Sequence, residues 1–334
     1  MSDLKRFSRR DFIKITAVIG GVIAGGKQLK NLLEEEFLTV RETRLLMGTV
    51  INLAVAADRR SSAEAAVAAV FGELERQVAI FTHREPNSPL AVLNRTGKLT
   101  EPPRELLEVL YKAREISKLT DGAFDITVKP LEDLYRDSQP GLPGADQIKS
   151  ALDLVDYRQL AVSAKEIALN QPGMAVTLDG IAKGYIVDAG SFVLKQMGFE
   201  NVFVEAGGDL VARGNKEGDE PWKIGIQTPR GSLSDLLARV PVTDQAAATS
   251  GDYFQFFSED LMNHHIIDPR IGFSSPELAS VTILSGNAML SDALATAVMV
   301  LGVDHGLMLL EGLENVAGYL ISKSMDVYQT AGFV

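Results

Sequence analysis

The 334-residue sequence predicts an α+β fold, and three observations support this prediction. Amphipathic helical stretches and short apolar strands follow each other without the regular strand–helix–strand alternation that a parallel sheet requires. The composition, 46% hydrophobic and 23% charged, is that of a folded globular chain. Turn signals such as Gln171-Pro172-Gly173 separate strand-like segments in the manner of antiparallel hairpins.

The expected elements can be given in chain order. Strands are expected over 37–56 (a pair joined at 47–49), 201–205, 222–227, 238–242, 281–284 and 318–322, with short strands and turns over 157–178. Helices are expected over 61–81, 103–120, 181–197, 292–301 and 304–310. Ser61 and Glu64 form a capping-box pattern at the first helix, and Pro103 suits the first position of the second.

The first 30 residues predict an export signal. Arg9 and Arg10 precede a soft apolar run over 15–26 that is too short to span a bilayer comfortably. This pattern resembles a twin-arginine signal, and without a clear Ala-x-Ala site it is a candidate membrane tether. A basic helix end before a buried helix is the alternative, which the glycines disfavour. We therefore expect a periplasmic protein with one functional domain over 37–334 and a sub-boundary near 139–144.

Charge and cysteine content exclude several function classes. The chain has 33 Lys and Arg against 44 Asp and Glu, a net charge of −11 that argues against nucleic acid as a partner. Without the first 30 residues the balance is 26 against 42, so the exported part is strongly acidic. The absence of Cys excludes disulfides, thiolate nucleophiles and Fe–S clusters.

Two segments carry groups suited to anions and hard metal ions. Gly180 allows close backbone approach at a turn from a strand into a helix, and Lys183 adds a positive charge there. Asp292 and Thr296 lie four residues apart, so on a helix both oxygens face one side and suit Mg²⁺. The alternatives are structural: a simple strand–helix connection, and an N-cap at Asp292 with Thr296 bonded back to its own helix.

Two more segments combine polar and aromatic groups. His265 lies in the polar segment 263–270 and is a candidate general base or phosphate contact, although a structural histidine is an equal alternative. Over 120–128, an Asp-Gly turn is expected to lead into a strand that begins with Phe124 and Asp125. An aromatic face beside a carboxylate suits a flat heteroaromatic ligand, but hairpin geometry alone also explains the pattern.

The order of these motifs resembles the ApbE family of FAD:protein FMN transferases, over about residues 40 to 325. The motifs are Met47-Gly-Thr49, the loop Ser88…Leu93-Asn94, Thr120-Asp-Gly-Ala-Phe-Asp-Ile-Thr-Val128, Gly180-Ile-Ala-Lys-Gly-Tyr185, Ala206-Gly-Gly-Asp209, Trp222…Gly225-Ile226, Ala248-Thr-Ser-Gly-Asp252, His265-Ile-Ile-Asp-Pro269 and Asp292-Ala-Leu-Ala-Thr296. The resemblance implies an Mg²⁺-dependent enzyme that binds FAD between two α+β halves. It implies transfer of FMN to a Thr or Ser hydroxyl of an acceptor protein, an electron-transfer subunit in the membrane or periplasm, with release of AMP.

The resemblance also assigns residues. Flavin-contacting positions are matched by Met47, Ala123, Phe124, Asp125, Lys183 and Ile266. Metal-site positions are matched by Asp292 and Thr296 through their side chains, by Gly180 through its carbonyl, and by Ala295. His265 matches a histidine that transfer needs.

The sequence departs from the family pattern at two sites. Many members have Asp-Leu-Gly-Gly where this chain has Thr177-Leu178-Asp179-Gly180. On a strand Asp179 would share the face of Thr177, so we expect Asp179 to compensate at this FAD-contacting position and to be the second candidate for the base. His83 stands where many members have Tyr, and its ring can still stack on a flavin.

Two other functions remain open on the sequence. In a FAD pyrophosphatase, water would replace the acceptor and the products would be free FMN and AMP. A non-catalytic periplasmic flavin-binding protein would hold FAD without releasing AMP.

Overall fold

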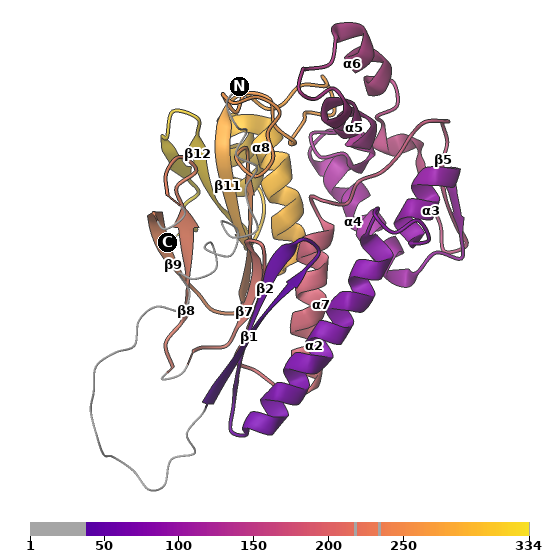
Figure 1. Ribbon diagram of the computed structural model, residues 1–334. Coiled ribbons are helices and arrows are strands. Elements are labelled where there is room, and N and C mark those ends of the chain that lie inside the picture. Colours follow the sequence, from indigo (N-terminus) through magenta and orange to yellow (C-terminus); the bar gives the residue numbers. More distant parts are fainter. Residues whose placement is uncertain (1–37, 217–218, 233–234, 334) are drawn as a thin grey trace, which may run out of the picture.

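The computed structural model describes residues 38–216, 219–232 and 235–333, and its main feature is an eight-stranded antiparallel sheet (Figure 1). In spatial order the strands are β1 (Leu38–Leu46), β2 (Thr49–Ala57), β6 (Val202–Ala206), β7 (Asp209–Arg213), β10 (Gln245–Gly251), β11 (Leu278–Ser285), β12 (Ala317–Ser322) and β13 (Val327–Gln329). The predicted signal over 1–30 lies outside the described residues.

Each face of this sheet has its own apolar core. The helices α2 (Arg60–Phe81), α7 (Ala182–Gln196) and α8 (Ala288–Glu311) cover one face. The hairpin of β8 (Trp222–Gln227) and β9 (Leu236–Val242) covers the other. Strand side chains alternate between the faces, so Val202 and Val204 pack toward the helices while Phe203 packs against Trp222.

A second, mainly helical region lies beside α2 and α7 (Figure 1). It contains α3 (Pro89–Thr96), α4 (Arg104–Leu119), α5 (Lys129–Asp137), α6 (Ala145–Leu152), the 3₁₀ turns η2 (Ile126–Val128) and η3 (Tyr157–Gln159), and a small sheet of β3 (Lys98–Thr100), β5 (Glu166–Leu169) and β4 (Leu160–Val162). Residues 139–144 connect α5 and α6, which contact each other through Leu131 and Ile148. The two regions together confirm the predicted α+β class.

Two local predictions are wrong. No strand begins at Phe124; instead Asp125 caps the 3₁₀ turn η2 by accepting a hydrogen bond from Thr127 N. The Ser61 capping box does not form either, because α2 starts two residues earlier, with Arg59 as its N-cap and no side-chain cap bond.

Helix α8 spans both predicted C-terminal helices, and its backbone breaks between them at Gly302. Its interior Gly302 adopts φ 78° and ψ −171°, a conformation that favours glycine, and Val303 N donates to Glu277 Oε2 at 3.2 Å beyond this break. Of the helices in the described residues, only α8 is long and apolar enough to cross a membrane, and 61% of its most apolar 18-residue stretch is buried. It contacts β10 and β11 as a core helix.

Helices α7 and α8 touch backbone to backbone at Gly184. A Cβ atom on Gly184 would overlap with the carbonyl group of Ala288 and lie 2.7 Å from the Cα atom of Met289. A side chain at this position would therefore push the two helices apart.

Replacing Gly184 with Ala should lower the free energy of unfolding by about 1–3 kcal/mol, because the added methyl group overpacks a backbone contact. Gly72→Ala is the matched control. Gly72 is exposed on the outer side of α2, and no atom lies within 4 Å of its Cβ position. The free energy of unfolding of that control should rise by up to about 1 kcal/mol, because Ala has a higher helix propensity than Gly. Urea denaturation measures the free energy of unfolding of each variant. Equal changes in the two variants would contradict the close contact between α7 and α8.

Candidate functional site

The β1–β2 hairpin presents Met47 beside the loop that carries His83. Met47 and Gly48 form a two-residue turn with φ values of 57° and 75°, which is typical of a type I′ hairpin. A positive φ is strained for Met and marks a constrained position. The Cβ position of Gly48 lies 3.7 Å from the guanidinium of Arg84, so the hairpin tip and the His83 loop are neighbours.

The segment over 123–127 is held by Asp125. One carboxylate oxygen accepts from Thr127 N and Oγ1 at 2.8 and 2.7 Å, and the other accepts from Tyr157 N at 2.8 Å. Burial raises the pKa of Asp125 despite these bonds. Ala123 and Phe124 are also buried. This carboxylate therefore orients the segment through internal bonds.

Thr177 and Asp179 do not share a face, which corrects the sequence prediction. Residues 174–178 form no strand; the side chain of Asn94 brackets Val176 N and O at 2.8 Å each, and Thr177 N donates to Ile126 O. Thr177 is buried, whereas Asp179 is exposed in the turn that precedes α7. The shared strand face therefore does not support Asp179 as a substitute for a carboxylate at 177, and its role stays a prediction.

The predicted metal-site residues come together between the start of α7 and the first turns of α8. Asp292 Oδ2 accepts from Gly184 N at 3.1 Å, and Asp292 Oδ1 lies 4.0 Å from Lys183 Nζ. The Cβ position of Gly180 is only 2.8 Å from Thr296 Oγ1, so this glycine leaves the hydroxyl accessible to the turn. Asn287, and not Asp292, is the N-cap of α8.

Two residues outside the predicted set belong to this cluster. Ser250 Oγ on β10 lies 3.2 Å from Thr296 Oγ1. Asp209, at the start of β7, is fully buried and forms an ion pair with Lys183. The sequence signal for Asp209 was its Gly-Gly-Asp turn, which alone does not indicate burial beside α7.

The cluster holds two carboxyl groups against one ammonium. Burial raises the pKa of Asp209 and raises that of Asp292 well above the usual range. Burial opposes the charge of Lys183, but the two carboxylates raise the pKa of its ammonium. Asp209 Oδ1 is buried without a hydrogen-bond partner. A bound cation would favour the ionised form of both carboxyl groups, and Asp209 Oδ1 would gain a partner, so the cluster is suited to a further cation.

The atoms that this cluster offers to a metal ion are hard oxygen ligands. Within the described residues no group of three His, Cys, Asp or Glu side chains could hold a metal ion. A metal here would depend on Asp292, the Thr296 hydroxyl, the Gly180 carbonyl and the Ala295 position, as the family resemblance implies. Carboxylate, hydroxyl and carbonyl oxygens with remaining water ligands suit Mg²⁺.

His265 lies on the loop between β10 and β11, and one hydrogen bond determines which of its ring nitrogens carries the proton. Its Nδ1 is 2.9 Å from the carbonyl oxygen of Gln255, which can only accept, so Nδ1 carries the proton and Nε2 has a free lone pair. Burial lowers the pKa of His265, while the charges of Asp179 and Lys183 also act on it. The neutral ring with a free Nε2 is the form that a general base needs.

The neighbours of His265 have structural roles. His264 is fully buried, its Nε2 bonds Ser275 O at 2.9 Å, and burial lowers its pKa to about 4. Asp268 accepts from the backbone and side chain of Arg270 at 2.7–2.9 Å. Ile266, a predicted flavin contact, is buried between these residues.

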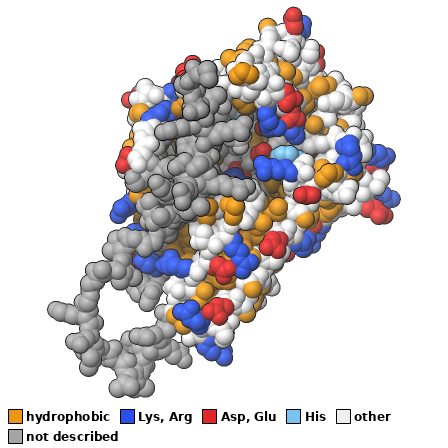
Figure 2. Space-filling view, viewed as in Figure 1, with side chains coloured by type: hydrophobic (Ala, Val, Ile, Leu, Met, Phe, Trp, Pro, Cys, Tyr) orange, Lys and Arg blue, Asp and Glu red, His pale blue; other side chains and the backbone are white. Residues whose placement is uncertain are grey.

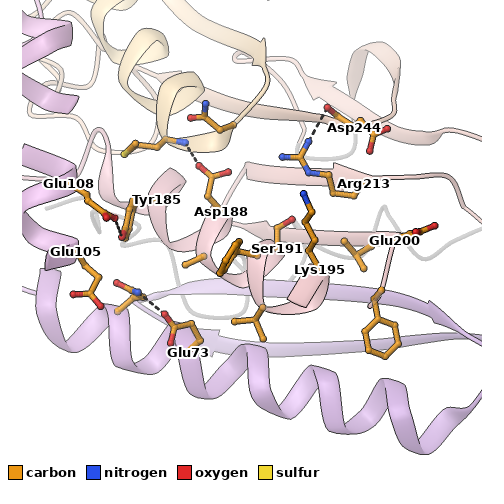
Figure 3. Close-up of a pocket in the computed structure, with 18 of the residues that line it drawn as sticks. Glu73, Glu105, Glu108, Tyr185, Asp188, Ser191, Lys195, Glu200, Arg213 and Asp244 are labelled. Carbon is orange, nitrogen blue, oxygen red and sulfur yellow. Dashed lines mark hydrogen bonds between the residues drawn. The ribbon is translucent and has the colours of Figure 1, made fainter. Parts of the chain in front are cut away.

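A separate groove lies on the outer side of α7 (Figure 3). It has a volume of ≈ 1380 Å³ and is lined by charged side chains of α2 and α4, by Tyr185, Asp188 and Phe192 of α7, and by the start of α8. Tyr185 donates to Glu108 at 2.7 Å across it. None of the described residues predicted to contact flavin or metal lines this groove.

The face in Figure 2 carries charges of both signs. Lys and Arg side chains are interspersed with Asp and Glu over the part that the structure describes. The expectation that nucleic acid is not a partner remains a prediction.

Comparison with known proteins identifies the family. A family model described as "ApbE family" matches residues 47–320. The chain belongs to the ApbE family. This confirms the resemblance seen in the sequence.

Its relatives are named FAD:protein FMN transferases. The one from Vibrio cholerae is 30% identical over 261 residues, covering 76% of this chain and 75% of the relative. The one from Treponema pallidum is 31% identical over 314 residues, covering 87% and 86%. These relatives are transferases, in agreement with the predicted enzyme class.

Solved ApbE structures share the fold. The flavin transferase ApbE from Vibrio cholerae superimposes with a TM-score of 0.79 at 26% identity, covering 89% of this chain and all of that one. The ApbE protein of Thermotoga maritima gives 0.80 at 28% identity, covering 88% and 97%. The α+β architecture is therefore the family's own.

Lys183→Met should destabilise the protein by on the order of 3 kcal/mol, because it leaves Asp209 and Asp292 buried without their cation. Adding Asp209→Asn should recover part of this loss, since one buried negative charge is removed. Urea denaturation of both single variants and the double variant measures this coupling. Additive effects would show that the ion pair does not act as a unit.

Proposed function

We propose that this ApbE-family protein transfers FMN from FAD to a Thr or Ser hydroxyl of an acceptor protein, with Mg²⁺ as cofactor and AMP as second product. The observation that carries the proposal is the convergence of Gly180, Asp292 and Thr296 beside Lys183. The names of the relatives support the same reaction.

The reaction breaks one P–O bond and forms another. The acceptor hydroxyl oxygen attacks the phosphorus of the FMN half, the bridging oxygen leaves with AMP, and the hydroxyl proton is released. The pyrophosphate is anionic and repels a nucleophile, so charge neutralisation is the main catalytic need. A bound Mg²⁺ would supply that neutralisation.

The residues divide this task between them. Asp292, Thr296 and the Gly180 and Ala295 oxygens would hold the metal ion. Lys183 contributes a fixed positive charge at the N-terminus of α7, which also favours phosphate.

His265 is the proposed general base. Its Nε2 is free because Nδ1 donates to Gln255 O, and its ring is only half-buried, so an acceptor hydroxyl can reach it. Asp179, exposed nearby, is the second candidate.

The acceptor and its location also belong to this proposal. The twin-arginine-like pattern at 9–10 supports export to the periplasmic side of the inner membrane. The acceptor is then an exported or membrane-bound electron-transfer subunit that carries the Thr or Ser.

Asp292→Asn should abolish flavin transfer, because the amide lacks the negative charge that a divalent cation needs. Incubation with FAD, Mg²⁺ and candidate acceptor proteins, followed by intact-mass spectrometry, measures the added FMN. Asp304→Asn, an exposed change of the same kind on α8, should retain activity. Full flavinylation by Asp292→Asn would refute the proposed metal role.

The same assay separates the other functions. Free FMN and AMP without labelled acceptor would indicate a pyrophosphatase. Bound FAD without AMP release would indicate a flavin-binding protein.

His265→Gln should lower the transfer rate by about 10²–10⁴-fold if the imidazole is the base. In the wild type the rate should fall as pH drops through the pKa of His265. Burial lowers this pKa, so the midpoint should lie below the ordinary ~6.5. A pH–rate profile at saturating acceptor measures this fall in rate at low pH, and the fall should be absent in His265→Gln.

His305→Gln, an exposed change on α8, is the matched control and should keep the full profile. If the rate of His265→Gln still falls at low pH as in the wild type, another group removes the proton.

A further inference from the structure

Helices α7 and α8 cap each other's N-termini. One turn after the contact at Gly184, Asp188 accepts hydrogen bonds from Ala288 N and Met289 N at 2.8 and 2.9 Å. One turn after Ala288, Asp292 accepts from Gly184 N at 3.1 Å. The two carboxylates thus occupy equivalent places on either side of one backbone contact.

Every amide of the first turn of α8 has a partner. Asp188 accepts from the first two, Asn287 Oδ1 accepts from Leu290 N at 2.9 Å, and Asn287 O accepts from Ser291 N. Asn287 belongs to α8 itself, so Asp188 is the cap that ties this helix start to α7. Figure 3 shows Asp188 pointing from α7 toward the start of α8.

This link bears on Asp292. One oxygen of Asp292 is engaged by Gly184 N, which leaves the other directed toward Lys183 and available to a cation. The separation between the Gly180 turn and Thr296 depends on the same helix crossing. Groups that orient metal ligands without touching the metal commonly change metal affinity by 10–100-fold.

We propose that Asp188 is a positioning residue for the metal site, holding α8 against α7 so that Asp292 and Thr296 meet Gly180. The inference rests on the proposed function, since it takes Asp292, Thr296 and Gly180 as ligands of the metal ion. Asp188 lies on the groove side of α7 and does not touch the site. Burial raises its pKa to about 6, so at neutral pH both its oxygens accept.

The test compares Asp188→Asn with Asn287→Ala in the purified full chain. Both variants weaken the capping of α8, but only Asp188→Asn weakens the link to α7, because its side chain keeps one acceptor oxygen where two backbone amides must be bound. Mn²⁺ titration followed by electron paramagnetic resonance reports metal affinity without turnover. Asp188→Asn should raise the Mn²⁺ dissociation constant about 10-fold or more, and Asn287→Ala should change it far less.

Hydrogen exchange gives a readout without metal. In Asp188→Asn the amide of Gly184 should exchange faster, because the crossing that holds Asp292 over it is loosened. In Asn287→Ala its exchange should match the wild type. Transfer assays should show a raised Mg²⁺ requirement for Asp188→Asn, with the rate largely recovered at saturating Mg²⁺.

Each outcome decides the proposal. Wild-type Mn²⁺ affinity in folded Asp188→Asn, or equal losses in both variants, would overturn it. If Asp188→Asn does not fold, Mn²⁺ binding to the wild type should still slow exchange of the Ala288 and Met289 amides relative to Leu290, and no slowing would overturn it. If the wild type binds no Mn²⁺, the proposed function fails, while Gly184 exchange still reports on the link between the caps.

Discussion

The backbone contact of α7 and α8 at Gly184 is the constraint from which the site follows. Two helices can approach this closely only where one lacks a side chain, and Gly184 faces the carbonyl of Ala288. The approach brings two helix N-termini to one place, with their unpaired amides and partial positive charge. Carboxylates then serve as caps: one oxygen of Asp292 caps α7 at Gly184, and its other oxygen is directed toward Lys183.

The charges gathered there are costly for a protein that binds nothing. Asp209 and Asp292 are buried with one ammonium between them, and one Asp209 oxygen has no partner. Buried ion pairs seldom stabilise a fold more than apolar packing would. Such a violation of ordinary packing is expected at functional sites, where a ligand completes the charge balance. The cluster is therefore better explained by binding than by stability.

Sequence patterns predicted those parts that depend on local spacing. The 47–49 hairpin, the amphipathic helices and the Asp292–Thr296 pair follow from periods of two and 3.6 residues. Parts that depend on distant contacts were not predicted. Strand β10 is rich in alanine and carries no periodic signal, so no role was assigned to Ser250 although its motif was recognised, and the burial of Asp209 depends on α7. The strand expected at Phe124 fails because Asp125 finds partners at Thr127 and Tyr157.

The distribution of burial fits a reaction between a small molecule and a protein. Asp292 and Asp209 are buried on rigid helix and strand ends, where fixed charges act strongly on a phosphate group. His265 lies half-buried on a loop, and backbone bonds to Gln255 hold its ring. A hydroxyl on a folded acceptor cannot enter a deep pocket, so its base must be reachable from the surface. Charged groups inside and an imidazole nearer the surface would meet both needs of the proposed reaction, in which the acceptor hydroxyl attacks a phosphorus of the bound dinucleotide.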